Sequence, residues 1–184
     1  MLSIGTRESD RITTITNTTW AEYISLDFPS KRVSFRNGVI TIVSPGRNHE
    51  LIGDYIRLII LAYCRNFNIS VFTFNQTTLK EEGKEGKEPD VAYCFEIDKD
   101  KPDLAVEINL TSGSIDDLTK YQYLKIAEVW LWEDNKIRFF GYGKSGYLEL
   151  NISNYLPNLN SERVTEIVNN CFGKSVLEVE KYFS

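Results

Sequence analysis

Hydrophobic residues recur along this chain at two spacings, and the spacing changes from segment to segment. Between residues 52 and 63 they return every three or four positions, which predicts one buried face of an α-helix. Shorter runs elsewhere are rich in β-branched and aromatic residues, which is typical of strands. The helical face is formed by Ile52, Tyr55, Ile56, Ile59, Ile60 and Tyr63.

A β-hairpin is the clearest local prediction. Asn37-Gly38 separates two β-rich runs, 33–36 and 39–43, and this dipeptide is a strong signal for a tight hairpin turn. Before it, residues 20–26 fit a short helix capped by Thr18 or Thr19. We interpret residues 1–12 as a loose leader.

Two further runs, 89–95 and 102–110, each open with Pro-Asp and read as strands, since proline is tolerated at a strand start. The mixed-charge run 80–88 that precedes them is interpreted as a solvated loop or hairpin tip. Six more elements follow from the same reasoning. They are a strand over 69–74, a helix over 115–125 with Ser114 as its cap, strands over 129–132, 137–142 and 147–150, and a helical tail over 161–184.

This order of elements predicts a single domain, 1–184, of the α/β class (bordering on α+β), with a central mixed β-sheet flanked by helices. The run Val129-Trp130-Leu131-Trp132 is wholly apolar, as expected in a sheet covered on both faces. No linker or repeat divides the chain.

The formal net charge of −5 argues against a protein that coats DNA through a basic surface. Any contact with DNA must therefore come from a local patch or a metal ion. The three cysteines form no CxxC pair, which argues against a zinc site. With no signal-peptide pattern and no apolar run long enough for a bilayer, we expect a cytoplasmic protein without a membrane partner.

Two acids stand out within apolar strands. Strand alternation places Asp90 with Ala92 and Cys94, and Glu107 with Ala105 and Asn109. If the strands are neighbours, both carboxylates converge over a cleft walled by small residues. Buried carboxylates need compensation, which a bound Mg²⁺ or Mn²⁺ supplies. The alternative is that Glu107 pairs with a nearby lysine or arginine and that Asp90 caps a strand entry.

A family resemblance runs through these same residues. It is carried by five segments in order: 88–93, 102–108, Thr111-Ser112-Gly113, Lys120-Tyr121-Gln122 and 128–134. Together they resemble the Uma-type family of restriction endonucleases within the PD-(D/E)XK nuclease superfamily, over roughly residues 18 to 160.

The resemblance implies a restriction-endonuclease-like fold, a Mg²⁺- or Mn²⁺-dependent cleavage of DNA, and a homodimer. It implies that Asp90 and Glu107 are the catalytic, metal-binding acids, with Glu50 as a candidate third ligand. Beside Glu50 stands His49, the single histidine, which is a further candidate.

The chain departs from the superfamily pattern at its lysine. Asn109 occupies the E-x-K lysine position, and Asp117 occupies the helical position where relatives place a lysine. Lys120 and Lys80 are the candidates to replace it, although Lys120 also fits a surface pair with Asp116. The leading hypothesis is an endonuclease. The alternatives are an inactive relative that binds nucleic acid or protein, and a small-molecule hydrolase that uses the same acids.

Overall fold

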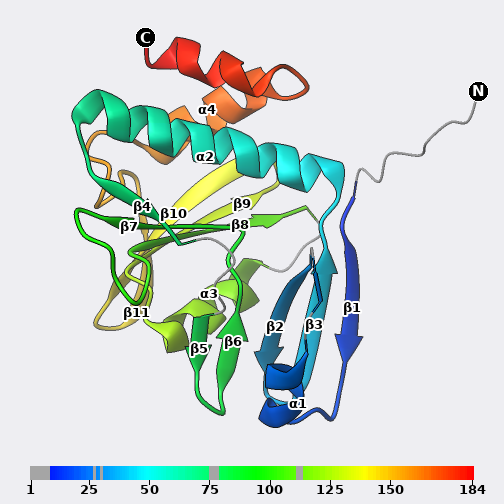
Figure 1. Ribbon diagram of the computed structural model, residues 1–184. Coiled ribbons are helices and arrows are strands. Elements are labelled where there is room, and N and C mark those ends of the chain that lie inside the picture. Colours follow the sequence, from blue (N-terminus) through cyan, green and yellow to red (C-terminus); the bar gives the residue numbers. More distant parts are fainter. Residues whose placement is uncertain (1–8, 27, 30, 75–78, 111–113) are drawn as a thin grey trace, which may run out of the picture.

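Two β-sheets and the helices around them make up the computed structural model (Figure 1). It describes residues 9–26, 28–29, 31–74, 79–110 and 114–184, and for residues 114–117 the backbone alone. Six strands form the larger sheet and five form the smaller one.

The larger sheet has the order β11-β10-β9-β8-β7-β4. Only β8 and β9 run parallel, because the helix α3 (Ser114–Leu124) carries the chain from one to the other. The other neighbours are antiparallel, which makes this the predicted mixed sheet. Its strands are β4 (Val71–Thr73), β7 (Val91–Phe95), β8 (Leu104–Asn109), β9 (Glu128–Glu133), β10 (Lys136–Gly143) and β11 (Gly146–Leu150).

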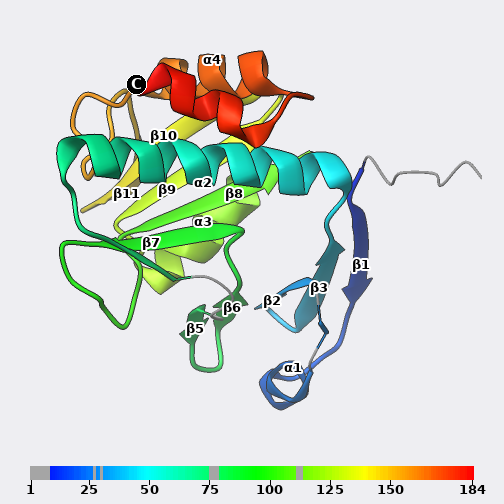
Figure 2. The ribbon, with the colours of Figure 1, turned by 45° about the horizontal axis from the view of Figure 1, so that its top comes forward.

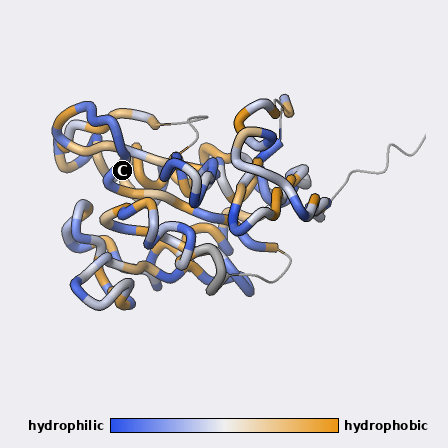
Figure 3. Tube along the Cα trace, turned by 90° about the horizontal axis from the view of Figure 1, so that it is seen from below, coloured by the Kyte–Doolittle hydropathy of each residue, from blue (hydrophilic) through white to orange (hydrophobic). Residues whose placement is uncertain are grey.

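Helices cover this sheet on both faces (Figures 1 and 2). One face packs against α2 (Arg47–Phe67), α4 (Ser161–Cys171) and the 3₁₀ helix η1 (Val176–Tyr182). The other face packs against α3. Strand alternation is confirmed on β8, where Val106 joins the α2 side and Ala105 the α3 side. In Figure 3, hydrophobic stretches run through the middle of the fold and hydrophilic stretches lie mostly at its periphery.

The smaller sheet is antiparallel throughout, with the order β1-β3-β2-β6-β5. The predicted hairpin is confirmed as β2 and β3, and its turn residues Asn37 and Gly38 have φ of 49° and 75°. The short helix α1 (Trp20–Ser25), capped by Thr19, is also confirmed. The strands are β1 (Arg11–Ile15), β2 (Arg32–Arg36), β3 (Val39–Ser44), β5 (Leu79–Glu81) and β6 (Glu85–Lys87).

The prediction of a loose leader over 1–12 is wrong where the structure describes it. Residues 1–8 lie outside the described part, but Arg11 and Ile12 begin β1, which pairs with β3 at the sheet edge. All five residues of β1 are exposed. A strand with no buried face leaves no alternation in the sequence, so the pattern could not reveal it.

The prediction of a solvated loop or hairpin tip over 80–88 is correct for its first half and wrong for β6. Residues 82–84 form the hairpin turn, but Glu85, Gly86 and Lys87 in β6 are buried. A Cβ atom on Gly86 would lie 2.4 Å from the Tyr23 ring, so the glycine lets α1 pack directly over β6. Charged residues are buried here because each meets a partner of opposite charge, as shown below.

The remaining elements follow the predictions closely, and the C-terminal tail is helical, with its second part a 3₁₀ helix. Within the described residues, no helix is both long and apolar enough to cross a membrane.

Candidate functional site

Asp90 and Glu107 lie opposite each other where β7 and β8 approach the smaller sheet. The β7–β8 ladder pairs Val91 with Val106, and its register continued by one residue sets Asp90 against Glu107. The backbone N–H of Ile108 donates to Asp90 Oδ2 at 2.9 Å. Both acids are buried, at 6% and 5% exposure. The two strands are therefore neighbours, which is the condition on which the predicted convergence of the two acids depended.

The Asp90 carboxylate is held by cations from two other elements. Its Oδ1 lies 2.9 Å from His49 Nε2 in α2 and 3.3 Å from Arg32 Nε in β2. Arg57, further along α2, donates to the Asp90 backbone carbonyl at 3.0 Å. Asp90 thus joins the larger sheet to α2 and to the smaller sheet.

His49 lies between two carboxylates, those of Asp10 and Asp90. Its Nδ1 lies 2.9 Å from Asp10 Oδ2, and the Gly46 N–H donates to Asp10 Oδ1 at 2.8 Å. Burial by itself would lower the pKa of His49, but the bonds to Asp10 and Asp90 and their charges raise it to about 10. The imidazole is therefore a cation at neutral pH.

The pKa of Asp90 is lowered, which favours the charged form of this residue as well. Burial raises the pKa of a carboxyl group, but here His49, the Ile108 N–H and the charge of Lys87 outweigh burial and lower it. Asp90 is thus ionised at neutral pH.

The Glu107 carboxylate has its own buried partners. Lys87 Nζ in β6 lies 3.0 Å from Glu107 Oε2, and the Tyr121 hydroxyl in α3 donates to Oε1. Lys87 Nζ also lies 5.6 Å from the centre of the Tyr121 ring, within reach of a cation–π contact. The pairing of Glu107 with a nearby lysine, left open by the sequence, is confirmed.

Sequence reasoning missed Lys87 because it lay in a run of mixed charge that looked solvated. One feature of the sequence could have indicated that Lys87 is buried. A turn at Gly83 pairs Leu79 with Lys87, and alternation along β6 then sets Glu85 and Lys87 on one face. Asp10 was missed because it lies in the segment that we interpreted as a loose leader. Nothing in the sequence around a single aspartate indicates which distant residue it will contact.

The other predicted residues lie on α2, β5, β8 and α3. Glu50 is exposed on α2, whereas its neighbour His49 faces Asp90. Lys80 is exposed in β5, and Asn109 and Lys120 are half-buried at the end of β8 and in α3. The side chains of Ser114, Asp116 and Asp117 lie outside the described residues. Across the described chain, no three His, Cys, Asp or Glu side chains gather in a way that suits a metal ion.

Asp103, the aspartate of the second Pro-Asp run, has different partners from Asp90. Asp103 Oδ2 accepts from the Phe95 N–H at 2.8 Å and from Lys99 Nζ at 2.6 Å. These bonds tie the β7–β8 connection together, away from the acid pair. The two Pro-Asp runs therefore place their aspartates in different surroundings, and Asp90 is the one that lies opposite Glu107.

Comparison with known proteins identifies the family and the fold. The model of the Uma2 family, described as "Putative restriction endonuclease", matches residues 20–171. A solved structure of a putative nuclease of DUF820 from Anabaena variabilis ATCC 29413 is 14% identical and has a TM-score of 0.55. The match covers 90% of this chain and 99% of that one. No curated protein matches the chain. The chain belongs to the Uma2 family of putative restriction endonucleases, and it has the restriction-endonuclease-like fold.

Proposed function

We propose that this protein is a metal-dependent endonuclease that hydrolyses phosphodiester bonds in DNA, with Asp90 and Glu107 as its metal ligands. The observation that carries the proposal is the opposed, buried acid pair with the Lys87 ammonium 3.0 Å from Glu107. Membership of the Uma2 family supports a nuclease function. Mg²⁺ or Mn²⁺ is the proposed cofactor.

The donor chemistry of the pair fits a hard divalent cation. Mg²⁺ typically takes one or two protein carboxylates and completes its shell with water and phosphate oxygens. Asp90 and Glu107 supply two carboxylates, and each carboxylate has about four lone-pair sites. A metal ion would share these carboxylates with the protein groups that already contact them, which are His49, Arg32, the Ile108 N–H, Lys87 and Tyr121.

The chain's own residues have distinct parts in this proposal. A bound divalent cation lowers the pKa of water and neutralises charge on the phosphate. Lys87 adds a positive charge from the protein, which stabilises the negative charge that grows during phosphoryl transfer. Tyr121 orients Glu107 through its hydroxyl, and His49 with Arg32 keeps Asp90 ionised and in place. Lys87 thus takes the part for which Lys120 and Lys80 were the candidates.

We further propose that the protein acts as a homodimer. One site cuts one strand, so breaking both strands of a duplex in one encounter needs two sites. With a net charge of −5, binding to DNA must rely on local contacts near the acid pair. Sedimentation with and without a DNA duplex tests the stoichiometry.

The test of the proposed function is cleavage of plasmid and of single-stranded DNA. We expect cleavage with Mg²⁺ or Mn²⁺, none with EDTA, and none for Asp90→Ala or Glu107→Ala. Thermal denaturation of each variant establishes that it is folded. Folded variants as active as the original protein would overturn the assignment.

A second candidate is the inactive relative that binds nucleic acid or protein. It is favoured by one observation: each of the four carboxylate oxygens already contacts a donor from the protein. Titration calorimetry with Mn²⁺ separates the two candidates. Binding that disappears in Glu107→Gln supports the nuclease, and absence of heat in the original protein supports the inactive relative.

A further inference from the structure

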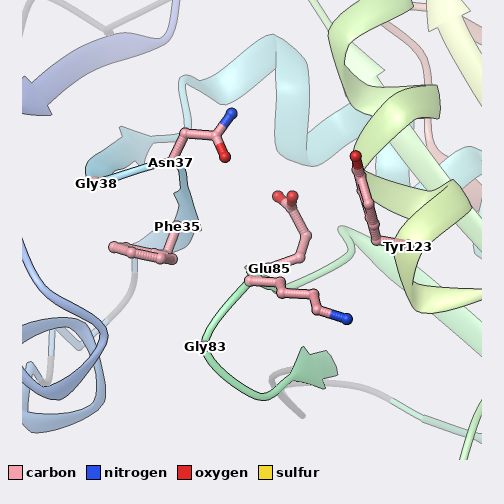
Figure 4. A pocket seen from close by; sticks show the side chains of 7 residues that line it. Phe35, Asn37, Gly38, Gly83, Glu85 and Tyr123 are labelled. Carbon is pink, nitrogen blue, oxygen red and sulfur yellow. The ribbon is translucent and has the colours of Figure 1, made fainter.

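A polar cavity of about 260 Å³ opens between the two hairpin turns of the smaller sheet and α3 (Figure 4). It is smaller than the usual site for a drug-sized ligand, and its size suits one planar ring system. Its walls are Phe35, Asn37, Gly38, Gly83, Lys84, Glu85 and Tyr123.

We propose that this cavity binds one unpaired nucleobase of the DNA strand being cut, and that it favours bases with an exocyclic amino group. The inference rests on the proposed function, and it names a substrate feature that the acid pair alone does not specify.

Tyr123 is the stacking surface of the cavity. Its side chain projects from α3 and is 49% exposed, although large aromatic residues are usually buried. Stacking on an aromatic ring is available to every base, because each has a π-face. Unpaired bases are the ones that can stack in this way, since paired bases already stack within the duplex.

The cavity is lined by one ammonium group, on Lys84, one carboxylate, on Glu85, and one amide, on Asn37. Figure 4 shows the Glu85 carboxylate standing between Asn37 and Tyr123. A carboxylate repels a phosphate but accepts hydrogen bonds from an amino group such as N4 of cytosine. Thymine has no such group. The Asn37 amide adds one donor and one acceptor for the rest of the base edge.

The turn that carries Asn37 is fixed before any ligand binds. The Thr18 N–H and hydroxyl both donate to the Gly38 carbonyl at 2.9 Å. On the inner side, Glu85 is buried and lies 3.8 Å from Arg36. A preformed wall lowers the entropy lost on binding.

The cavity and the acid pair share β6 and α3. Glu85 lines the cavity and Lys87 contacts Glu107, and the two residues lie on one face of β6 about 7 Å apart by the rise of a strand. On α3, Tyr123 lines the cavity, whereas Tyr121, which lies two residues earlier and so on another face of the helix, contacts Glu107. A base in the cavity therefore leaves its sugar-phosphate backbone within reach of Lys87 and Glu107.

The test is fluorescence anisotropy of labelled single-stranded twelve-residue probes, oligo(dC) and oligo(dT), with the full chain in EDTA so that no cleavage occurs. We expect oligo(dC) to bind about tenfold more tightly than oligo(dT), an affinity ratio worth about 1.4 kcal/mol. Tyr123→Ala weakens oligo(dC) binding about tenfold. Tyr123→Phe keeps it, and so does the control Phe172→Ala, which removes an equally exposed ring beyond α4.

Three results would overturn the inference: no binding of either probe, equal binding of both, or unchanged binding by Tyr123→Ala. Failure of the proposed function looks different. If the original protein never cleaves DNA yet binds oligo(dC) through Tyr123, the base site is supported and the nuclease function is overturned. If the original protein cleaves DNA and the Tyr123→Ala variant binds and cleaves DNA equally well, the nuclease function is supported and the base site is overturned.

Discussion

Lys87 Nζ lies 3.0 Å from Glu107 Oε2, and both side chains are buried. The contact joins β6 of the smaller sheet to β8 of the larger one. It also brings a cation to the acid pair from a strand that the E-x-K pattern does not include. Asn109 at the expected lysine position therefore does not leave the pair without a lysine.

The first prediction concerns activity. Lys87→Met lowers the cleavage rate at least ~100-fold, because the loss of one charge-stabilising group typically costs a factor of that order. Lys120→Met and Lys80→Met lower it less than ~3-fold. Initial rates on plasmid DNA measure this. A Lys87→Met protein with its original rate, or a Lys120→Met protein as slow as Lys87→Met, contradicts the assignment.

The second prediction concerns stability. Lys87→Met lowers the free energy of unfolding by about 3 kcal/mol, because Glu107 is left buried without its counter-charge. Lys87→Met combined with Glu107→Gln loses less, since the uncompensated charge is gone. Urea denaturation of the original protein, both single variants and the double variant gives a double-mutant cycle, which measures the interaction between the two residues. Additive losses would show that the two residues do not interact.

The third prediction concerns pH. The pKa of His49 is about 10 when folded and 6.5 when unfolded, so its stabilisation is complete below pH 6.5 and disappears as pH rises through 10. The pKa of Asp90 is lowered, so its contribution is lost as pH falls below 3.8. The melting temperature of the original protein minus that of His49→Gln therefore shrinks between pH 6.5 and 10. A constant difference over this range contradicts the ion pair.

The fourth prediction concerns the close packing of α1 on β6. Gly86→Ala destabilises the fold by about 1–3 kcal/mol, because the new methyl group would overlap the Tyr23 ring. Gly143→Ala is the matched control, since a Cβ there meets its nearest neighbour at an ordinary 3.6 Å. Equal melting temperatures for the two variants would show that Tyr23 moves aside without cost.

Sequence patterns predicted the helices and strands of this fold that have a buried face. The helical spacing from Ile52 to Tyr63 and the turn at Asn37-Gly38 both lead directly to observed elements. The acid pair was also predictable, because alternation sets Asp90 and Glu107 on matching strand faces.

The partners of the acid pair could not be predicted in the same way. Lys87 lies 20 residues from Glu107, and Asp10 lies 39 residues from His49. Their contacts depend on how the smaller sheet docks on the larger one. Local periodicity reports which face of an element is buried, but not which distant charge will meet it.

The central claim is most directly tested by one comparison of initial cleavage rates in Mn²⁺, between Glu107→Gln and Glu50→Gln. Both changes remove one negative charge and preserve side-chain shape, but Glu107 is buried beside Asp90 and Lys87 whereas Glu50 is exposed. We predict that Glu107→Gln loses at least ~100-fold in rate and that Glu50→Gln retains the rate of the original protein. Equal rates for the two variants would contradict the account.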